Sequence, residues 1–410
     1  MRWNRRSERN WGRLGMKYKT YSVAELIDEI AMGPFGSNIK VSCFVDEGIP
    51  VLNGSNLDDF VLKEDSFRYI TEEKANSLKK ANAYRGDIVI THRGTLGQVS
   101  YIPENSKYDR YVISQSQFRV KCNNKVLPEY LVYYLHTPIG QHKLLSNASQ
   151  VGVPALARPT TTFQQLEIEL PDIQTQKKIV SVLNSLQKKI ALTQQINDNL
   201  EQQIDLIYQS FFAEDMERVE LGKAIKTTSG GTPSRKNLVF YENANIPWVK
   251  SKELSGNFIT DTEEKINQLA LNKSSAKLLP SHSVLVAMYG ATVGEYGIIT
   301  TEMACNQAIC VLLENCDYPF TYLFEFVKHF QEVLKSRAIG SAQQNISQLV
   351  IKQLMVHSNT DKIKKYHKIV LPLFQKMELL CKENARLTDI RDCLLPKLMS
   401  GEISFGGNES

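Results

Sequence analysis

Residues 169–212 read ELPDIQTQKKIVSVLNSLQKKIALTQQINDNLEQQIDLIYQSFF, and most of the architecture follows from this segment. Its apolar side chains recur in alternating steps of four and three, which is the heptad pattern of a coiled-coil helix. The seam of this helix consists of Ile179, Leu183, Leu186, Ile190, Thr193, Asn197, Leu200, Ile204, Ile207 and Phe211. A helix of about 38 residues is about 55 Å long. Because its apolar face is too narrow for a globular core, we expect it to need one partner helix.

A second seam of the same kind lies near the end of the chain. It consists of Leu373, Met377, Leu380, Asn384, Leu387, Arg391, Leu394 and Leu398. Pro171 precedes the first helix and Gly401 follows the second, as boundary signals should. Asn197 and Asn384 occupy matching seam positions. They either fix the register of the pair at a cost in stability or are ordinary polar residues in a solvated stretch. We expect the two helices to pair with each other, antiparallel if a pseudo-twofold axis relates the two halves.

The sequence before each helix is a repeat. Thr95 and Gly97 in RGTLGQVSYI correspond to Thr292 and Gly294 in GATVGEYGII, 197 positions later. Short β-branched and aromatic runs alternate with Gly, Pro, Asn and Ser clusters, which predicts short strands and turns. A helical stretch follows in both copies. We therefore predict an α+β fold with two similar mixed α/β domains, each followed by a long helix of an antiparallel coiled coil.

Six segments are expected along the chain. They are a basic extension at 1–16, a first domain at 17–170, a central helix at 171–214, a second domain at 215–358, a distal helix at 359–403 and a flexible tail at 404–410. The extension holds five arginines in its first fifteen residues and no apolar segment, so it is not a secretory signal. It is either a disordered extension upstream of a start at Met16 or a basic arm that lies on phosphates.

Composition excludes several classes of protein. Hydrophobic residues make up 42% and charged residues 23% of the chain, as in an ordinary globular protein. The net charge of +5 favours an anionic partner only weakly. The seven cysteines form no CxxC pair, which indicates reduced thiols in a cytoplasmic protein rather than a zinc site. No apolar run approaches the ~20 residues that span a membrane, so no membrane partner is expected.

Catalytic motifs are missing from the sequence. The repeated glycine loop is not followed by the Lys-Ser or Lys-Thr of a phosphate-binding loop. HExxH, GxSxG and the kinase motifs do not occur, and no glycine-rich loop pairs with the Pro-Pro tetrapeptide of an adenine methyltransferase. Pro171-Asp172 opens a helix and lacks the nearby Glu-x-Lys of a nuclease. The sequence therefore predicts a chain without a catalytic residue or a metal site.

Recognition of DNA remains, because the loops are rich in side chains that bind base edges or phosphates. In the first copy these are Ser37, Asn38, Lys40, His92, Arg93, Gln98, Gln115 and Gln117. In the second copy they are Ser234, Arg235, Lys236, Lys250, Lys252, Gln307, Gln343, Gln344 and Asn345. Each alone is equally consistent with an ordinary polar loop residue, so the hypothesis rests on the whole set.

The order of these features resembles the specificity subunit of a type I restriction-modification system. Residues 169–212 are similar to the central conserved region of that family. GGTPS at 230–234, IPWVKSKEL at 246–254, ATVG, and ARLTDIRDCLLPKLMSGEI at 385–403 resemble it too. The resemblance covers about residues 17 to 403, and its first copy has GPFGSN where the second has the Gly-Thr-Pro-Ser loop.

The resemblance implies a non-catalytic protein that binds double-stranded DNA. Two target-recognition domains would each bind one half of a split, asymmetric sequence. The helices would set the spacer between the half-sites, with centres near one DNA turn of ~34 to 36 Å apart, and dock two methyltransferase subunits. Restriction and motor subunits would add to these, and S-adenosylmethionine, ATP and Mg would lie on the partner subunits. The alternative is a coiled-coil scaffold with two protein-binding domains and no DNA sequence preference.

Overall fold

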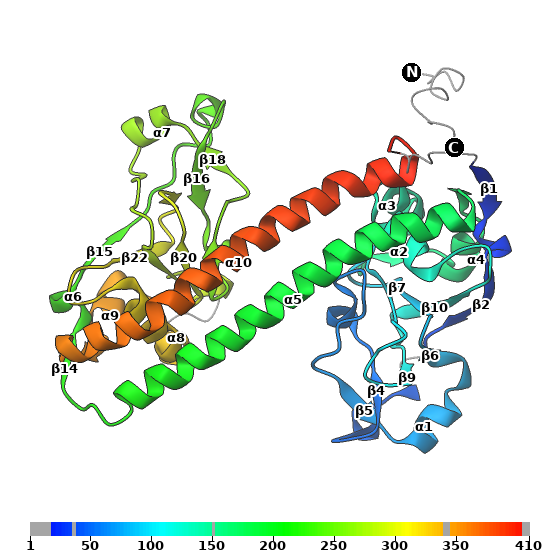
Figure 1. The fold of residues 1–410 in the computed structure, drawn as a ribbon, viewed down its shortest axis with the longest axis horizontal. Helices are drawn as coiled ribbons and strands as arrows, with labels where there is room; N and C mark the ends of the chain where they lie inside the picture. The colour runs from blue at the N-terminus through cyan, green and yellow to red at the C-terminus, as the bar shows by residue number, and fades with distance from the viewer. Residues whose placement is uncertain (1–17, 35–37, 150–151, 339–344, 404–410) are drawn as a thin grey trace, which may run out of the picture. The chain divides into compact units, whose positions relative to one another are not determined.

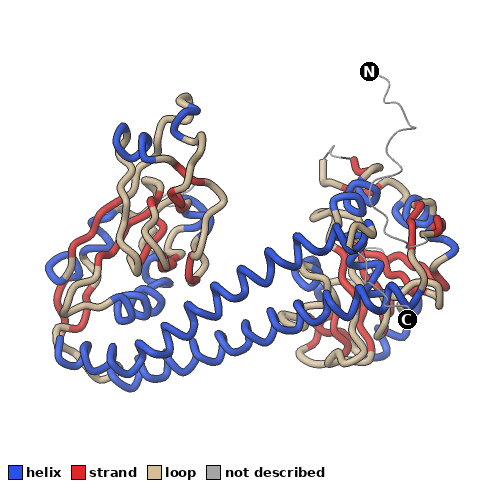
Figure 2. The backbone as a smooth tube through the Cα atoms, turned by 45° about the horizontal axis from the view of Figure 1, so that its top comes forward, coloured by secondary structure: helices blue, strands red, loops and turns tan. Residues whose placement is uncertain are grey.

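The computed structural model describes residues 18–34, 38–149, 152–338 and 345–403. The chain divides into two compact units, unit 1 with residues 1–188 and 389–410 and unit 2 with residues 189–388. Two long helices, α5 (Ile173–Phe212) and α10 (Thr360–Ser400), each contribute to both units, and Figure 2 draws each as one continuous helix. Among the described residues, no helix is both long and apolar enough to span a membrane.

Unit 1 contains two main sheets (Figure 1). The first has the order β2 (Ile27–Met32), β10 (Gln117–Cys122), β7 (Ile88–Thr91) and β8 (Val99–Tyr101), with every pair antiparallel. The second has the order β3 (Phe44–Val45), β5 (Arg68–Ile70), β4 (Ile49–Val51), β9 (Arg110–Val112) and β6 (Asn82–Tyr84), with β4 and β9 parallel. Two short pairs and four helices complete the unit: β1 (Lys19–Ser22) with β13 (Glu167–Leu170), β11 (Ala148–Ser149) with β12 (Ala155–Leu156), α1 (Glu72–Ser77), α2 (Pro128–His136), α3 (Pro138–Leu145) and α4 (Pro159–Gln164).

Strand β7 separates two hydrophobic layers of unit 1. Successive side chains of a strand point to opposite faces. Ile88 and Ile90 therefore pack with α2 and with the ends of α5 and α10 in one cluster. Val89 packs on the other face with Tyr111 and Val112 of the second sheet. The alternation places the second sheet on the face of β7 away from the long helices.

Unit 2 has the same plan. Its five-stranded sheet has the order β15 (Lys226–Ser229), β22 (Ile309–Leu313), β19 (Val284–Ala287), β20 (Tyr296–Ile299) and β17 (Asn257–Ile259). A three-stranded sheet has the order β18 (Lys265–Ile266), β16 (Ile246–Val249) and β21 (Ala304–Cys305), with β16 and β21 parallel. The remaining elements are β14 (Arg218–Glu220) paired with β23 (Met355–His357), α6 (Leu221–Ala224), α7 (Gln268–Lys273), α8 (Phe320–Ser336) and α9 (Gln348–Lys352).

The topology repeats between the units, which confirms the predicted duplication. The order β2-β10-β7-β8 corresponds to β15-β22-β19-β20, and the parallel pair β4–β9 corresponds to β16–β21. Matching glycines mark the same close approach of two backbones. A Cβ on Gly33 would lie 1.9 Å from the Ser114 carbonyl oxygen, and one on Gly230 would lie 2.1 Å from that of Cys305. Only glycine fits there, which explains why both copies keep it.

The long helices pair antiparallel, as predicted. In unit 1, Arg391 Nη1 donates to Gln187 Oε1 at 2.9 Å. In unit 2, Thr193 Oγ1 donates to Asn384 Oδ1, and Asn197 Nδ2 donates to Cys381 Sγ at 3.4 Å. Rising residue numbers in α5 thus meet falling numbers in α10. Both seam asparagines make contacts across the helix pair.

The predicted seam positions are buried or half-buried. The buried ones are Ile179, Leu183, Asn197, Ile204, Met377, Leu380 and Leu398, and the half-buried ones are Leu186, Ile190, Leu200, Ile207, Leu373, Asn384, Leu387 and Leu394. The apolar stripe is broader than the seam in unit 2, where Tyr208, Phe212, Tyr366 and Phe374 join the core. The expectation that the apolar face of each long helix is too narrow for a globular core is therefore incomplete, because side chains of both helices also form part of the hydrophobic cores of the units.

Candidate nucleic-acid interface

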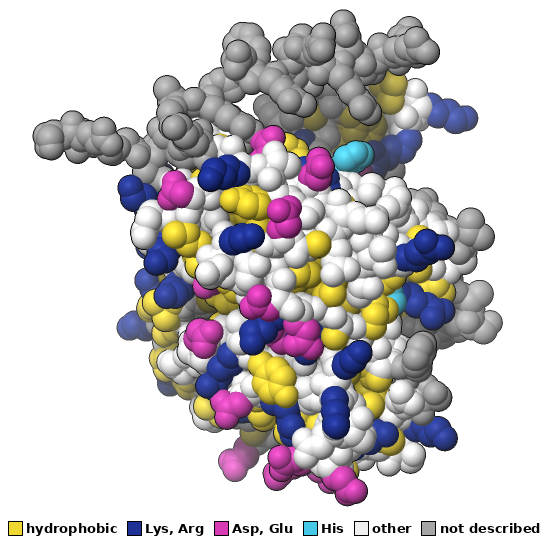
Figure 3. Space-filling model, turned by 90° about the vertical axis from the view of Figure 1, so that its right-hand side faces the viewer, with side chains coloured by type: hydrophobic (Ala, Val, Ile, Leu, Met, Phe, Trp, Pro, Cys, Tyr) yellow, Lys and Arg dark blue, Asp and Glu magenta, His cyan; other side chains and the backbone are white. Residues whose placement is uncertain are grey.

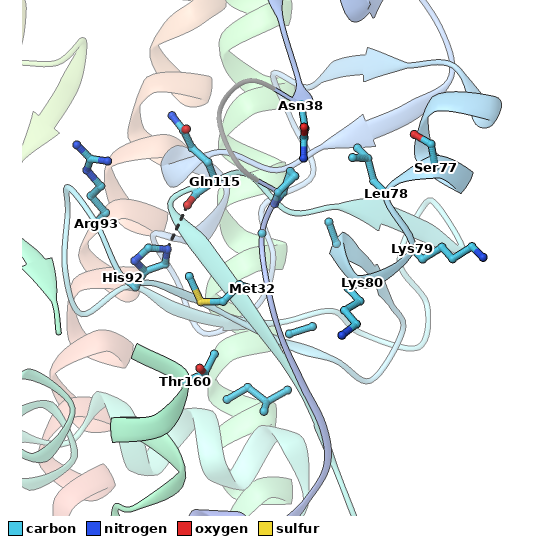
Figure 4. A pocket seen from close by; sticks show the side chains of 15 residues that line it. Met32, Asn38, Ser77, Leu78, Lys79, Lys80, His92, Arg93, Gln115 and Thr160 are labelled. Carbon is cyan, nitrogen blue, oxygen red and sulfur yellow. Dashed lines mark hydrogen bonds between the residues drawn. The ribbon is translucent and has the colours of Figure 1, made fainter. Parts of the chain in front are cut away.

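A hollow of about 810 Å³ lies on unit 1 where several predicted recognition residues meet. Its wall comes from the end of β2, the β7–β8 loop, the β9–β10 turn, the turn Lys79–Ala81 and Thr160 of α4 (Figure 4). Four predicted residues line it, namely Asn38, His92, Arg93 and Gln115. The fold thus brings together side chains from three separate loops of the first copy.

His92 and Gln115 are held side by side. His92 Nε2 lies 3.1 Å from the Gln115 carbonyl oxygen (Figure 4), an acceptor, so this nitrogen carries the proton and Nδ1 is left as an acceptor. Burial lowers the pKa of His92, which keeps the imidazole neutral at neutral pH. The Gln115 side chain is exposed. The pair therefore presents neutral donors and acceptors, which can pair with base edges.

The hollow is basic. Lys79, Lys80 and Arg93 line it with exposed side chains, and none of its described lining residues is acidic. The face of unit 1 in Figure 3 shows Lys and Arg interspersed with Asp and Glu. Sequence reasoning missed Lys79 and Lys80. The adjacent pair of lysines was the available signal, but a lysine pair is common on any solvated surface and does not by itself indicate a DNA contact.

Other candidates of the first copy lie elsewhere. Gln98 donates to the Gly54 carbonyl at 3.0 Å and to Asp58 Oδ1 at 2.6 Å, so its amide holds a loop of unit 1. Gln117 is fully buried, and its Oε1 accepts from the Ser114 N–H at 2.9 Å. Lys40 is exposed ahead of the turn Val41–Cys43. Ser37 lies outside the described residues, as do the extension at 1–16 and the tail at 404–410.

The segments of unit 2 that correspond to the loops around the hollow of unit 1 carry different side chains. The Met288 N–H donates to the Ala308 carbonyl at 2.8 Å, just as the His92 N–H donates to that of Ser116 at 2.8 Å. Tyr289 forms a β-bridge with Asn345, matching the bridge between Arg93 and Ala155. The second copy thus has exposed Tyr289, Gln307 and Asn345 on the corresponding segments. Gln343 and Gln344 lie outside the described residues.

The basic candidates of the second copy are mostly paired with two glutamates. Arg235 lies 2.5 Å from Glu264 Oε2, and Lys250 lies 2.8 Å from Glu264 Oε1. Lys252 contacts Glu263 at 2.6 Å. Arg235 and Lys250 lower the pKa of Glu264 to about 2, with the Arg235 hydrogen bond as the largest cause. The three positive charges are therefore largely neutralised within the unit.

Arg235 is also held by rings, and its neighbours are exposed. Its guanidinium carbon lies 4.8 Å from the ring centre of Tyr241 and 5.0 Å from that of Trp248. Ser234 and Lys236 are exposed on either side of it. Gln307 is exposed, and its Oε1 accepts from Thr232 Oγ1. Lys236 thus remains the exposed cation of this segment for which the structure gives no carboxylate partner.

Comparison with known families gives two matching regions. Residues 40–202 and 213–371 each match the family described as type I restriction modification DNA specificity domain. These regions cover most of the chain and coincide with the two halves of the structural repeat.

Two relatives align over most of their lengths. The specificity subunit of the type I restriction enzyme HindI from Haemophilus influenzae is 24% identical over 403 residues, covering 78% of this chain and 87% of the relative. The specificity subunit of the type I restriction enzyme MjaIX from Methanocaldococcus jannaschii is 24% identical over 422 residues, covering 95% of both chains.

A solved structure shows the same fold. The crystal structure of a type I restriction-modification system S subunit from M. genitalium aligns with a TM-score of 0.59 at 15% identity. The alignment covers 94% of this chain and 96% of that chain.

Proposed function

Because the chain belongs to the type I restriction-modification DNA specificity family and carries two copies of its domain, we propose that it reads a bipartite DNA target for a type I restriction enzyme. It is a non-catalytic specificity subunit. Each recognition domain, residues 17–170 and residues 215–358, reads one half of the target. The long helices fix the spacer between the two halves.

The observation that carries this proposal is the repeated site with unlike side chains. The same segments form it in both units, and Gln115 corresponds to Gln307, but His92 and Arg93 of unit 1 are replaced by Met288 and Tyr289 in unit 2. Since different side chains select different base edges, the two half-sites have different sequences. The target is therefore asymmetric.

The residues divide into two roles. Lys79, Lys80 and Arg93 bind phosphates, which gives affinity without sequence preference. Asn38, His92 and Gln115 read base edges in the first half-site, and Gln307 and Asn345 do so in the second. The contact set omits Gln98, whose amide nitrogen donates inside unit 1, and Gln117, whose side chain is fully buried.

The helices supply the surface for the partner subunits. Leu192 and Leu206 of α5 are 57% and 65% exposed, and Leu379 of α10 is 59% exposed. Large exposed apolar side chains mark surfaces that other proteins cover. Two methyltransferase subunits dock on the helices, and restriction and motor subunits join through them. S-adenosylmethionine, ATP and Mg are bound by these partners.

Sequencing of methylated DNA tests the proposal. Cells that express this chain with its methyltransferase should methylate one bipartite asymmetric sequence. Gln115→Ala should relax only one half-site, and Asn345→Ala only the other, by about 1 to 3 kcal/mol of discrimination for a lost bidentate contact. A scaffold without DNA preference predicts no enriched sequence. Relaxation of both half-sites by either single change would contradict the assignment of one domain to each half.

A further inference from the structure

Three potential metal ligands meet within unit 2, away from the recognition loops. Asp205 lies on α5, and Glu325 and His329 lie one helical turn apart on α8. One ligand atom from each lies within 4.8 Å of the other two. His329 Nε2 is 3.0 Å from Asp205 Oδ1, and the His329 ring stacks on Tyr208 at 4.6 Å. Glu325 and His329 are 120 and 124 positions from Asp205 in the sequence, so no local pattern indicates this cluster.

Glu325 is an unpartnered buried carboxylate within this cluster. Its side chain is 1% exposed, and Oε2 has no hydrogen-bond partner. The nearest cation, Lys328 Nζ, is 3.9 Å from this oxygen and instead contacts Glu201 Oε1 at 2.8 Å. A buried carboxylate is costly unless a proton, a hydrogen bond or a cation satisfies it.

The fold does not require an acid at this position. Tyr130-Leu131 of α2 corresponds to Tyr322-Leu323 of α8, 192 positions later, so Tyr133 corresponds to Glu325 in the repeat. The Tyr133 hydroxyl donates to Asn184 Oδ1 at 2.8 Å, so unit 1 fills this position with a paired neutral group. Glu325 is thus a specific feature of unit 2, with a ligand atom within 4.8 Å of those of His329 and Asp205.

We propose that Asp205, Glu325 and His329 bind one divalent transition-metal ion, with Zn²⁺ as the best match, and that the ion braces α5 against α8 within unit 2. Zn²⁺ takes carboxylate oxygen and imidazole nitrogen ligands. Asp205 and His329 are 26% and 30% exposed, so solvent reaches the site and water completes the coordination.

The charges around the site fit a dication. Once Glu325 is ionised, Glu201, Asp205 and Glu325 carry three negative charges, and Lys328, within 3.9 Å of each of them, carries one positive charge. An ion of charge +2 balances the excess. Ligands at ~2.0 to 2.2 Å from Zn²⁺ lie about 3.5 Å apart, so on binding the Asp205–His329 pair opens slightly from 3.0 Å, and pairs that now lie as far as 4.8 Å apart close by up to roughly 1 Å. Burial raises the pKa of Glu325 to about 8, so the ion displaces a proton and binds more tightly as pH rises.

Zinc titration of the full chain tests the site. The parent protein carries Cys316→Ser and Cys393→Ser, which remove the two exposed thiols as competing ligands, and is stripped with EDTA. A chromophoric chelator then measures the Zn²⁺ affinity, and Co²⁺ in its place reports coordination through its visible absorption. We expect one equivalent to bind and to raise the melting temperature.

Matched variants separate this site from other ligands. Glu325→Gln and His329→Gln keep side-chain size and should weaken Zn²⁺ binding by at least about tenfold. Glu332→Gln changes an 84% exposed acid on the same helix and should leave the affinity unchanged. Circular dichroism verifies that each variant is folded. Equal Zn²⁺ affinity in the parent and both ligand variants would overturn the proposal, as would a folded parent that binds no ion, since Glu325 would then hold only a proton.

Discussion

Lys79→Ala together with Lys80→Ala should weaken DNA binding by the same factor for every DNA sequence. Both side chains are exposed at the hollow of unit 1, and no described residue lining the hollow is acidic. Their charges are therefore available to phosphates. Phosphate contacts position a protein on DNA but do not read bases, so the methylated sequence should stay the same.

The size of the effect follows from counterion release. Each phosphate contact contributes about 0.9 to the slope of log affinity against log salt concentration. Loss of two contacts should reduce that slope by about 1.8. As salt rises from 50 to 200 mM, the ratio of the parent's DNA affinity to that of the double variant should then fall by about tenfold.

Fluorescence anisotropy with labelled DNA, at several salt concentrations, measures this slope for the chain in complex with its methyltransferase. Lys252→Ala is the matched control, because Glu263 already lies 2.6 Å from the Lys252 ammonium. Its slope should change by clearly less than 0.9. An unchanged slope in the Lys79 and Lys80 double variant, or a changed target sequence, would refute the phosphate role.

Three further predictions concern stability and spacing. Arg119→Met should destabilise unit 1 by about 3 to 5 kcal/mol in urea unfolding, because buried Asp87, which lies 3.3 Å from Arg119 Nη1, loses its cation. The double variant Arg119→Met with Asp87→Asn should recover most of the lost stability, and no recovery would contradict this cause. Insertion of four residues between Ala191 and Leu192 should abolish subunit assembly or change the length of the DNA spacer, while both half-site sequences persist. Altered half-site sequences with an unchanged spacer would contradict the role of the helices in setting the spacer length. Burial raises the pKa of Glu325 to about 8, so metal-free protein loses stability as pH rises from about 4.3 towards 8. Glu325→Gln should therefore raise the melting temperature at pH 8 and not at pH 4. An equal shift at both pH values would rule out titration of this carboxyl as the cause.

The repeat and the helix pair could be predicted because both leave regular spacings in the sequence: a constant offset between matching residues and a heptad spacing of apolar side chains. Heptad spacing identifies a seam wherever one helix faces one partner. At the unit 2 end of α5, however, Tyr208 and Phe212 are buried while the predicted Ile207 and Phe211 are only half-buried. There the helix packs against α8 and α10 together, and a pattern derived for one partner does not describe two.

The recognition residues were harder to predict because residue type does not determine exposure. Gln115 and Gln117 are two positions apart, yet one lies exposed in a turn and the other begins β10 with its side chain buried. Similarly, Lys250 pairs with Glu263 and Glu264, which are 13 and 14 positions away. Such pairings depend on the positions of strands β16 and β18, which the sequence pattern does not specify.

The division of both long helices between the two units has a consequence for biosynthesis. The core of unit 1 includes Leu395, Leu398 and Met399, which are among the last described residues to be translated. The whole of unit 2, about 200 residues, is made between the two parts of unit 1. At ~5 to 20 residues per second, the ribosome needs about 10 to 40 seconds for that interval. The domain synthesised first therefore completes its core only after unit 2 has been made, and a nonsense mutation that removes residues 395–399 damages the N-terminal domain.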